Sequence, residues 1–148
     1  MTPDEAAARL RAYPEVRETE TWGERAFFVN PGGRLARGAY FATIKTADGP
    51  DDRASALSRP GVWRLNFGAR RPDCVARFGP PPPRPAKGGT VEGPWDFTAL
   101  DRPTPHPICG WMGWIAVLTP SPETFAALLP ALDGAHARAL ATAEKRLG

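Results

Sequence analysis

The sequence predicts an α+β domain in which a mostly antiparallel sheet is covered by N-terminal and C-terminal helices. Both ends of the chain carry helical patterns, the apolar runs between them are short and bounded by turn residues, and one run alternates strictly between apolar and polar side chains. With 148 residues, the chain has the usual size of one domain. We therefore expect a single domain over residues 1–148, with a Pro-rich loop at about residues 80–89.

The first helix and a hairpin account for the N-terminal third. Thr2, followed by proline and then by glutamate three positions on, forms a capping-box pattern that predicts a helix to about Tyr13. The apolar runs at residues 25–29 and 40–46 are separated by Asn-Pro-Gly-Gly, which is strong turn chemistry and predicts a hairpin with a long loop. Residues 51–57 fit one or two helical turns.

The clearest strand pattern has the sequence VWRLNF. The side chains of Trp63, Leu65 and Phe67 point to one face, which belongs in the core, and those of Arg64 and Asn66 point to the other. The polar face needs an explanation. It is either a binding surface or a solvent-exposed strand face.

Four further segments complete the expected fold. Residues 71–78 predict a short helix, and the prolines of residues 80–85 predict an extended segment, for which a stiff surface loop is favoured over a Pro-rich recognition ligand. Residues 112–118 are apolar at nearly every position, which is typical of a central buried strand. Ser121 begins a long amphipathic helix, continuous or kinked at Pro130.

The charge of the chain is unevenly distributed. The formal net charge is +3, but residues 59–89 contain seven basic residues against Asp73 alone, a net +6. Such a segment is typical of a site for nucleic acid or another polyanion. The alternative is a compositional bias toward arginine, which the sixteen arginines against three lysines also fit.

Localisation and cofactors follow by elimination. The N-terminus has acids where a signal peptide is basic, and no apolar run reaches the length of a membrane span, so we expect a cytoplasmic protein without a membrane partner, either monomer or dimer. Cys74 and Cys109 form no CxxC pair and are expected to be free thiols. Together with His106 and His136 they lack the paired spacing of a zinc site, so we expect no metal and no cofactor.

The candidate binding residues gather around the polar strand. Arginine donates in a planar fork and asparagine both donates and accepts, so Arg64 and Asn66 suit a carboxylate, a phosphate or a base edge. A neighbouring tryptophan adds a stacking surface. The full expected set is Arg64, Asn66, Arg70, Arg71, His106, Trp111 and Trp114. In the alternative, Arg64 pairs with an acid such as Asp96 or Asp101.

A catalytic interpretation rests on His106 and Asp101 alone. The two are five residues apart, and prolines at 103, 105 and 107 hold the stretch extended. A lone histidine near an acid is a weak signal, and no nucleophile motif accompanies it. The sequence therefore favours a rigid structural corner beside a pocket, and a protein that is not an enzyme.

Several segments together resemble a known family. WGERAFFVNP, YFATIKT, LSRPGVWRLNFGA, DFTALDRPTPHP and GWMGWIAVLTPSPETFAALLPAL look like a family of small, functionally uncharacterised bacterial proteins that is similar to the MmcQ/YjbR-like proteins. The resemblance implies an antiparallel sheet with helices, of frataxin-like shape, and DNA binding through a double wing. It implies no catalytic residues.

The expected function is therefore a non-enzymatic binding domain for an anionic ligand or nucleic acid. Two alternatives stay open. One is a small enzyme using His106 and Asp101 in a Trp-lined pocket, and the other is a protein-interaction module.

Overall fold

A six-stranded sheet forms the centre of the computed structural model, which describes all residues from 1 to 148. Its strand order is β1-β2-β3-β4-β6-β5, and every pair of neighbouring strands is antiparallel. The strands are β1 (Val16–Thr21), β2 (Glu24–Val29), β3 (Ala39–Lys45), β4 (Arg64–Gly68), β5 (Thr104–Pro105) and β6 (Trp114–Leu118).

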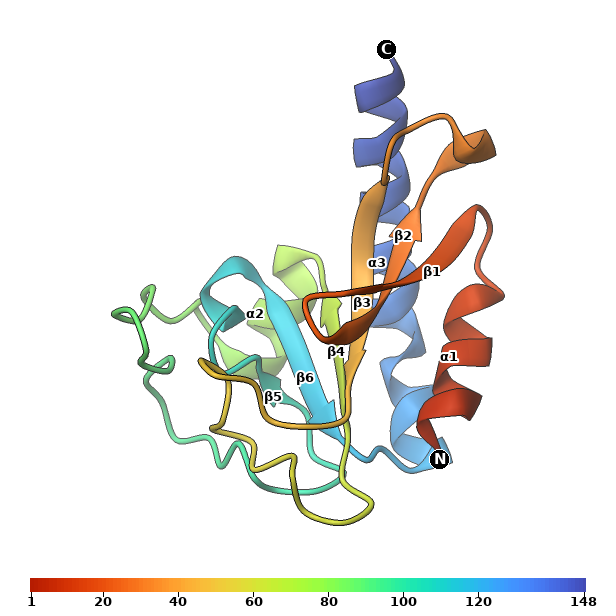
Figure 1. The fold of residues 1–148 in the computed structure, drawn as a ribbon. Helices are drawn as coiled ribbons and strands as arrows, with labels where there is room; N and C mark the ends of the chain where they lie inside the picture. The colour runs from red at the N-terminus through yellow and green to blue at the C-terminus, as the bar shows by residue number, and fades with distance from the viewer.

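Helices α1 (Pro3–Arg11) and α3 (Pro122–Leu147) pack on one face of the sheet (Figure 1). They bury their small and apolar side chains against the odd-numbered residues of β4, so the main core holds 23 buried residues. A third helix, α2 (Arg71–Phe78), follows β4. The predicted α+β architecture with N-terminal and C-terminal helices over an antiparallel sheet is confirmed. No helix has an apolar stretch that could cross a lipid bilayer.

Most predicted elements form where the sequence placed them. The Thr2 capping box is present, with the Glu5 N–H donating to the Thr2 hydroxyl at 3.1 Å, although α1 ends at Arg11 rather than near Tyr13. Helix α2 covers the predicted range, and β2 pairs with β3 as the expected hairpin. Helix α3 is continuous through Pro130.

Two elements differ from the expectation. Strand β1 was not predicted because its sequence, VRETET, is polar and has no apolar alternation; it is an edge strand joined to β2 by a turn at Trp22 and Gly23. Both turn residues have positive φ, 58° and 72°, as a two-residue hairpin turn requires. Residues 51–57 contain turns and no helix.

The second face of the sheet is covered in part by loops, and Tyr40 of β3 stays exposed on it. Residues 46–62, here called the covering segment, run across the ends of β4 and β6. Leu57 and Val62 of this segment form a small apolar cluster with Leu118 of β6. The molecule therefore has a helical layer, a sheet and a thinner layer of loops (Figure 1).

Candidate anion-binding site

Arg64 lies at the centre of a buried polar network between β4 and the covering segment. Its side chain has no exposed surface, and all five of its N–H groups face polar atoms of the protein. Nε donates to Asn66 at 2.7 Å. Nη1 donates to Asp52 at 3.0 Å and Ser55 at 2.9 Å, and Nη2 reaches Asp52 at 2.5 Å and His106 Nε2 at 3.2 Å. No donor of Arg64 is left for a ligand.

The network continues across the neighbouring strands. Asn66 Nδ2 donates to Thr43 Oγ1 at 3.0 Å and to Glu24 Oε1 at 3.3 Å, while Lys45 stands opposite Arg64 in the β3–β4 register. Burial raises the pKa of Glu24, and the positive charges of Lys45 and Arg64 oppose that rise. The polar face of β4 is thus closed by internal partners, unlike the solvent-exposed face considered from the sequence.

Asp52 is the counter-ion of Arg64. Burial alone raises its pKa, but the hydrogen bonds and charge of Arg64 outweigh that effect and hold the pKa below its ordinary value. The acids considered from the sequence lie elsewhere. Asp101 accepts a hydrogen bond from the Ser121 N–H at 2.7 Å, beside the start of α3, and Asp96 bonds within its own loop.

His106 meets N–H donors at both ring nitrogens. The backbone N–H groups of Ile108 and Cys109 point at Nδ1, at 3.1 and 3.0 Å, and Arg64 points at Nε2. A neutral imidazole has one bare nitrogen and one N–H group. A protonated imidazole has an N–H group on both nitrogens, and both would then face other N–H donors. Burial, followed by the charge of Arg64, lowers the pKa of His106 to about 3. The ring is neutral and offers no free lone pair, and Asp101 makes no bond to it.

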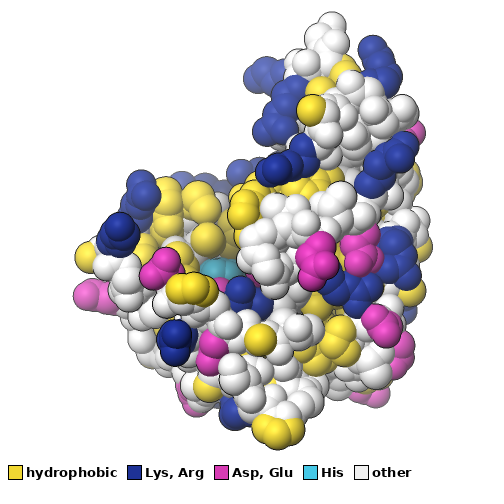
Figure 2. Space-filling view, viewed as in Figure 1, with side chains coloured by type: hydrophobic (Ala, Val, Ile, Leu, Met, Phe, Trp, Pro, Cys, Tyr) yellow, Lys and Arg dark blue, Asp and Glu magenta, His cyan; other side chains and the backbone are white.

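A separate, basic surface surrounds Met112, which lines three adjoining hollows of about 260, 470 and 530 Å³. We call it the Met112 surface. Its basic residues are Arg70, Arg71, Arg84, Lys87, Arg138 and Arg146, all exposed. Asp51 is the one acid that lines it. Figure 2 shows a hollow with apolar side chains on its walls, basic and acidic side chains around its rim, and a histidine at its floor.

A 3-10 helix and strand β6, joined at Gly113, position two tryptophans of this surface. A short 3-10 helix, Gly110–Met112, presents Trp111, and Gly113 in the left-handed conformation (φ 93°) turns the chain into β6. Trp114 then begins β6 with its ring 5.2 Å from that of Tyr40. The guanidinium of Arg84 lies over the Trp111 ring, 4.9 Å from its centroid.

A family model described as a family of unknown function, DUF6194, matches residues 1–148. The chain belongs to DUF6194. Neither a curated protein nor a solved structure matches it. The DUF6194 model accounts for the whole chain, and the comparisons show no link to the MmcQ/YjbR-like proteins.

In this DUF6194 chain the predicted binding residues fall into two groups. Arg64, Asn66 and His106 belong to the buried network. Arg70, Arg71 and Trp111 line one hollow of the Met112 surface together, and Trp114 lines the adjoining one. No residue of the buried group lines any of the three hollows, although Ile108 and Cys109, whose N–H groups bond to His106, line the hollow of about 530 Å³.

The sequence did not predict several residues of this candidate site. Arg138 and Arg146 come from α3, far along the chain, yet with Thr142 they repeat at a spacing of four, which places them on one helix face. That spacing was a usable signal. The pairing of Asp52 with Arg64 had no such signal in the sequence, because it depends on how the covering segment folds back over the sheet.

The cysteines and histidines take structural places in the DUF6194 fold. Both cysteines are free thiols, and burial raises the pKa of each. Cys74 Sγ donates to the carbonyl of Gly113 at 3.0 Å. His136 stacks on Tyr13 in the core. No group of three or more His, Cys, Asp or Glu side chains is placed to hold a metal ion.

Proposed function

We propose that this protein is a non-enzymatic binding domain for an anionic ligand, which it holds on the Met112 surface. The observation that carries the proposal is the charge of that surface: six exposed basic residues against one acid line three hollows that share one methionine. Concave, positively charged sites concentrate anions, and the guanidinium fork suits phosphate and carboxylate oxygens. The basic middle of the sequence supplies four of the six residues, and α3 supplies the other two.

Nucleic acid is one form that the anion can take. The resemblance to the MmcQ/YjbR-like proteins supports DNA binding as a proposal, and a cytoplasmic location would suit it. Two of the hollows, of about 470 and 530 Å³, fall within the range of about 300–1,000 Å³ that is usual for small-ligand pockets. We therefore favour a small anion or a short single strand over duplex DNA.

The test is binding at two salt concentrations. Fluorescence anisotropy would measure the Kd of a labelled 12-nucleotide single strand, and calorimetry that of pyrophosphate. The double variant Arg70→Ala/Arg71→Ala should weaken both tenfold or more and should flatten the dependence of log Kd on log salt. A matched control, Arg53→Ala/Arg102→Ala, removes two exposed arginines outside the hollows and should change little.

Equal losses in the two double variants would show only a general charge effect and would overturn the site. Failure of the wild type to bind either anion at low salt would overturn the function itself. In that case the interaction-module alternative would gain weight. The enzyme alternative has no supporting observation, because His106 and Asp101 hydrogen-bond to separate partners.

A further inference from the structure

The three hollows of the Met112 surface differ in chemistry. The hollow of about 470 Å³ is lined by Arg70, Arg71 and Arg138 and by no acid. The hollow of about 530 Å³ carries Asp51 at its edge, together with Arg84 and Lys87. An anionic group is therefore better placed in the first hollow than in the second, where a carboxylate repels it.

The second hollow has the lining of a ring site. Apolar walls are formed by Pro85, Ile108 and Met112, and the turn at residues 86–89 brings main-chain polar groups to its edge. That turn is closed by the Gly89 N–H bonding to the Ala86 carbonyl at 2.8 Å, which leaves other backbone groups of the turn free to bond a ligand. Apolar walls with a few polar groups are typical of pockets for small organic molecules.

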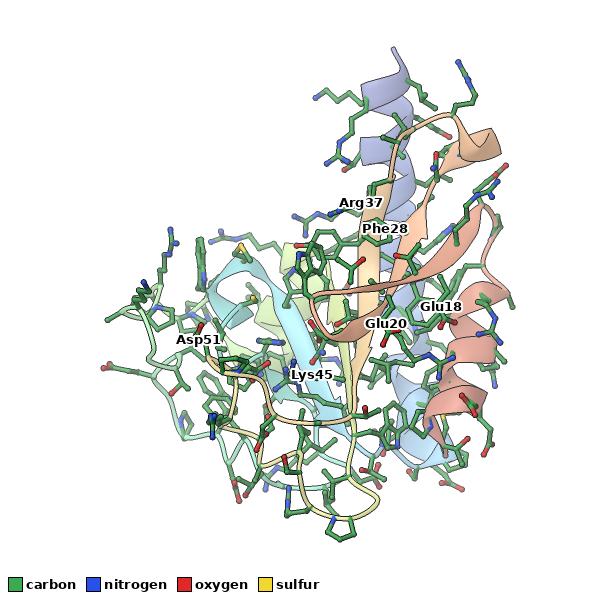
Figure 3. All side chains as sticks on the ribbon, viewed as in Figure 1. Glu18, Glu20, Phe28, Arg37, Lys45 and Asp51 are labelled. Atoms are coloured by element: carbon green, nitrogen blue, oxygen red, sulfur yellow. The ribbon has the colours of Figure 1, made fainter.

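Trp111 connects the two hollows, because it lines both of them. Arg84 lies over its ring, and an indole ring attracts planar groups to its faces. Figure 3 shows Asp51 in the loop layer, apart from Phe28 and Arg37, which lie together beside β2 and β3. Asp51 can accept a hydrogen bond from a ligand hydroxyl or amino group at the far end of the site.

From this arrangement we infer that the ligand class is a nucleotide: a planar ring in the 530 Å³ hollow against Trp111, joined by a polar linker to phosphate in the 470 Å³ hollow at Arg70 and Arg71. This inference rests on the proposed function and adds the orientation of the ligand. The ring and the phosphate of the nucleotide must both contribute to binding. Phosphate alone and a nucleoside alone should therefore each bind more weakly than the nucleotide.

Calorimetry with adenosine monophosphate, adenosine and inorganic phosphate tests the inference on the wild type. Adenosine monophosphate should bind at least tenfold more tightly than either fragment. Trp111→Leu should lower the affinity for adenosine monophosphate tenfold and leave the affinity for phosphate unchanged. Arg70→Ala/Arg71→Ala should lower the affinity for both. Trp22→Leu, which removes an exposed tryptophan at the β1–β2 turn, is the matched control.

The outcomes separate the two proposals. If phosphate and adenosine monophosphate bind equally, or Trp111→Leu binds both normally, the nucleotide inference is overturned and the anion-binding function stands. If the 12-nucleotide single strand binds but adenosine monophosphate does not, the nucleotide inference is likewise overturned. If no anion binds at all, both fall. Should Trp111→Leu unfold, Asp51→Leu gives a second test, because it should weaken adenosine binding without weakening phosphate.

Discussion

At the scale of single residues, Arg64 shows what a strand pattern does and does not predict. The alternation in VWRLNF predicted which side chains face away from the core, and the structure confirms that Leu65 and Phe67 are buried beneath the helices. The same pattern could not predict that Arg64 is itself fully buried, because burial depends on Asp52 and Ser55 arriving from the covering segment. Burying an arginine without charge and hydrogen-bond partners would strongly destabilise the folded state, so the fold requires these partners.

His106 gives a pH dependence of stability at the same scale. In the unfolded chain its pKa is near the ordinary 6.5, and in the folded protein it is about 3. Between these values the unfolded state binds the extra proton, so stability falls as pH falls through that window, by at most about 1.4 kcal/mol per pH unit. Chemical denaturation between pH 4 and 7 measures the slope.

The control for this prediction is His106→Asn. An asparagine side-chain oxygen can take the place of Nδ1 and accept the N–H groups of Ile108 and Cys109, but it does not titrate. Its stability should therefore fall less steeply with acid than that of the wild type. Parallel curves for the two proteins would show that His106 does not carry the effect.

At the scale of elements, the strongest local signals predicted structure well. Caps, periodic apolar runs and turn chemistry placed α1, α2 and the β2–β3 hairpin, because each depends on neighbouring residues in the chain. Strand β1 was missed because an edge strand needs few apolar side chains and is held by pairing with β2. Met112 was expected inside a strand, but it closes the 3-10 helix before β6.

Pro130 gives a prediction for α3. It lies on the exposed side in the interior of a 26-residue helix, where proline lacks an N–H and crowds the preceding turn. Pro130→Ala should therefore stabilise the protein, by about 1–3 kcal/mol. Pro122→Ala is the matched control: it sits at the first helical position, where proline is well tolerated, and should change stability by only a few tenths. Urea unfolding midpoints compare the three proteins, and equal midpoints would contradict the prediction.

At the scale of the whole molecule, the candidate site is assembled from distant parts of the chain. Arg70 and Arg71 follow β4, Arg84 and Lys87 lie in the Pro-rich loop, and the remaining arginines come from α3. The sequence predicted an electropositive middle segment but not the contribution of the C-terminal helix, since that follows from how α3 crosses the sheet. Residues of the buried network and of the basic surface are also close neighbours in the sequence, within residues 64–71. For this reason they were predicted to form one site.

The layered arrangement predicts which part of the molecule opens first. The covering segment is held to the sheet chiefly by Asp52 and Ser55 on Arg64 and by a small apolar cluster, whereas the helices share the main core. Asp52→Asn removes the charge that neutralises the buried Arg64, so the segment should open more often than the rest of the fold. Cleavage by trypsin after Arg53 should then rise tenfold or more, since each 1.4 kcal/mol lost raises the open population tenfold.

The control is Asp51→Asn, which removes a charge from the neighbouring residue. Asp51 is exposed and makes no hydrogen bond in the structure, so this substitution should leave the rate of cleavage after Arg53 unchanged. Mass spectrometry of early fragments distinguishes local from global opening. Cuts confined to Arg53 mean that the covering segment detaches while the sheet and helices remain folded, so the Arg64 network holds the two layers together. Cuts that rise equally along α1 and α3 would instead mean that the network supports the whole fold, and that the loop layer does not open on its own.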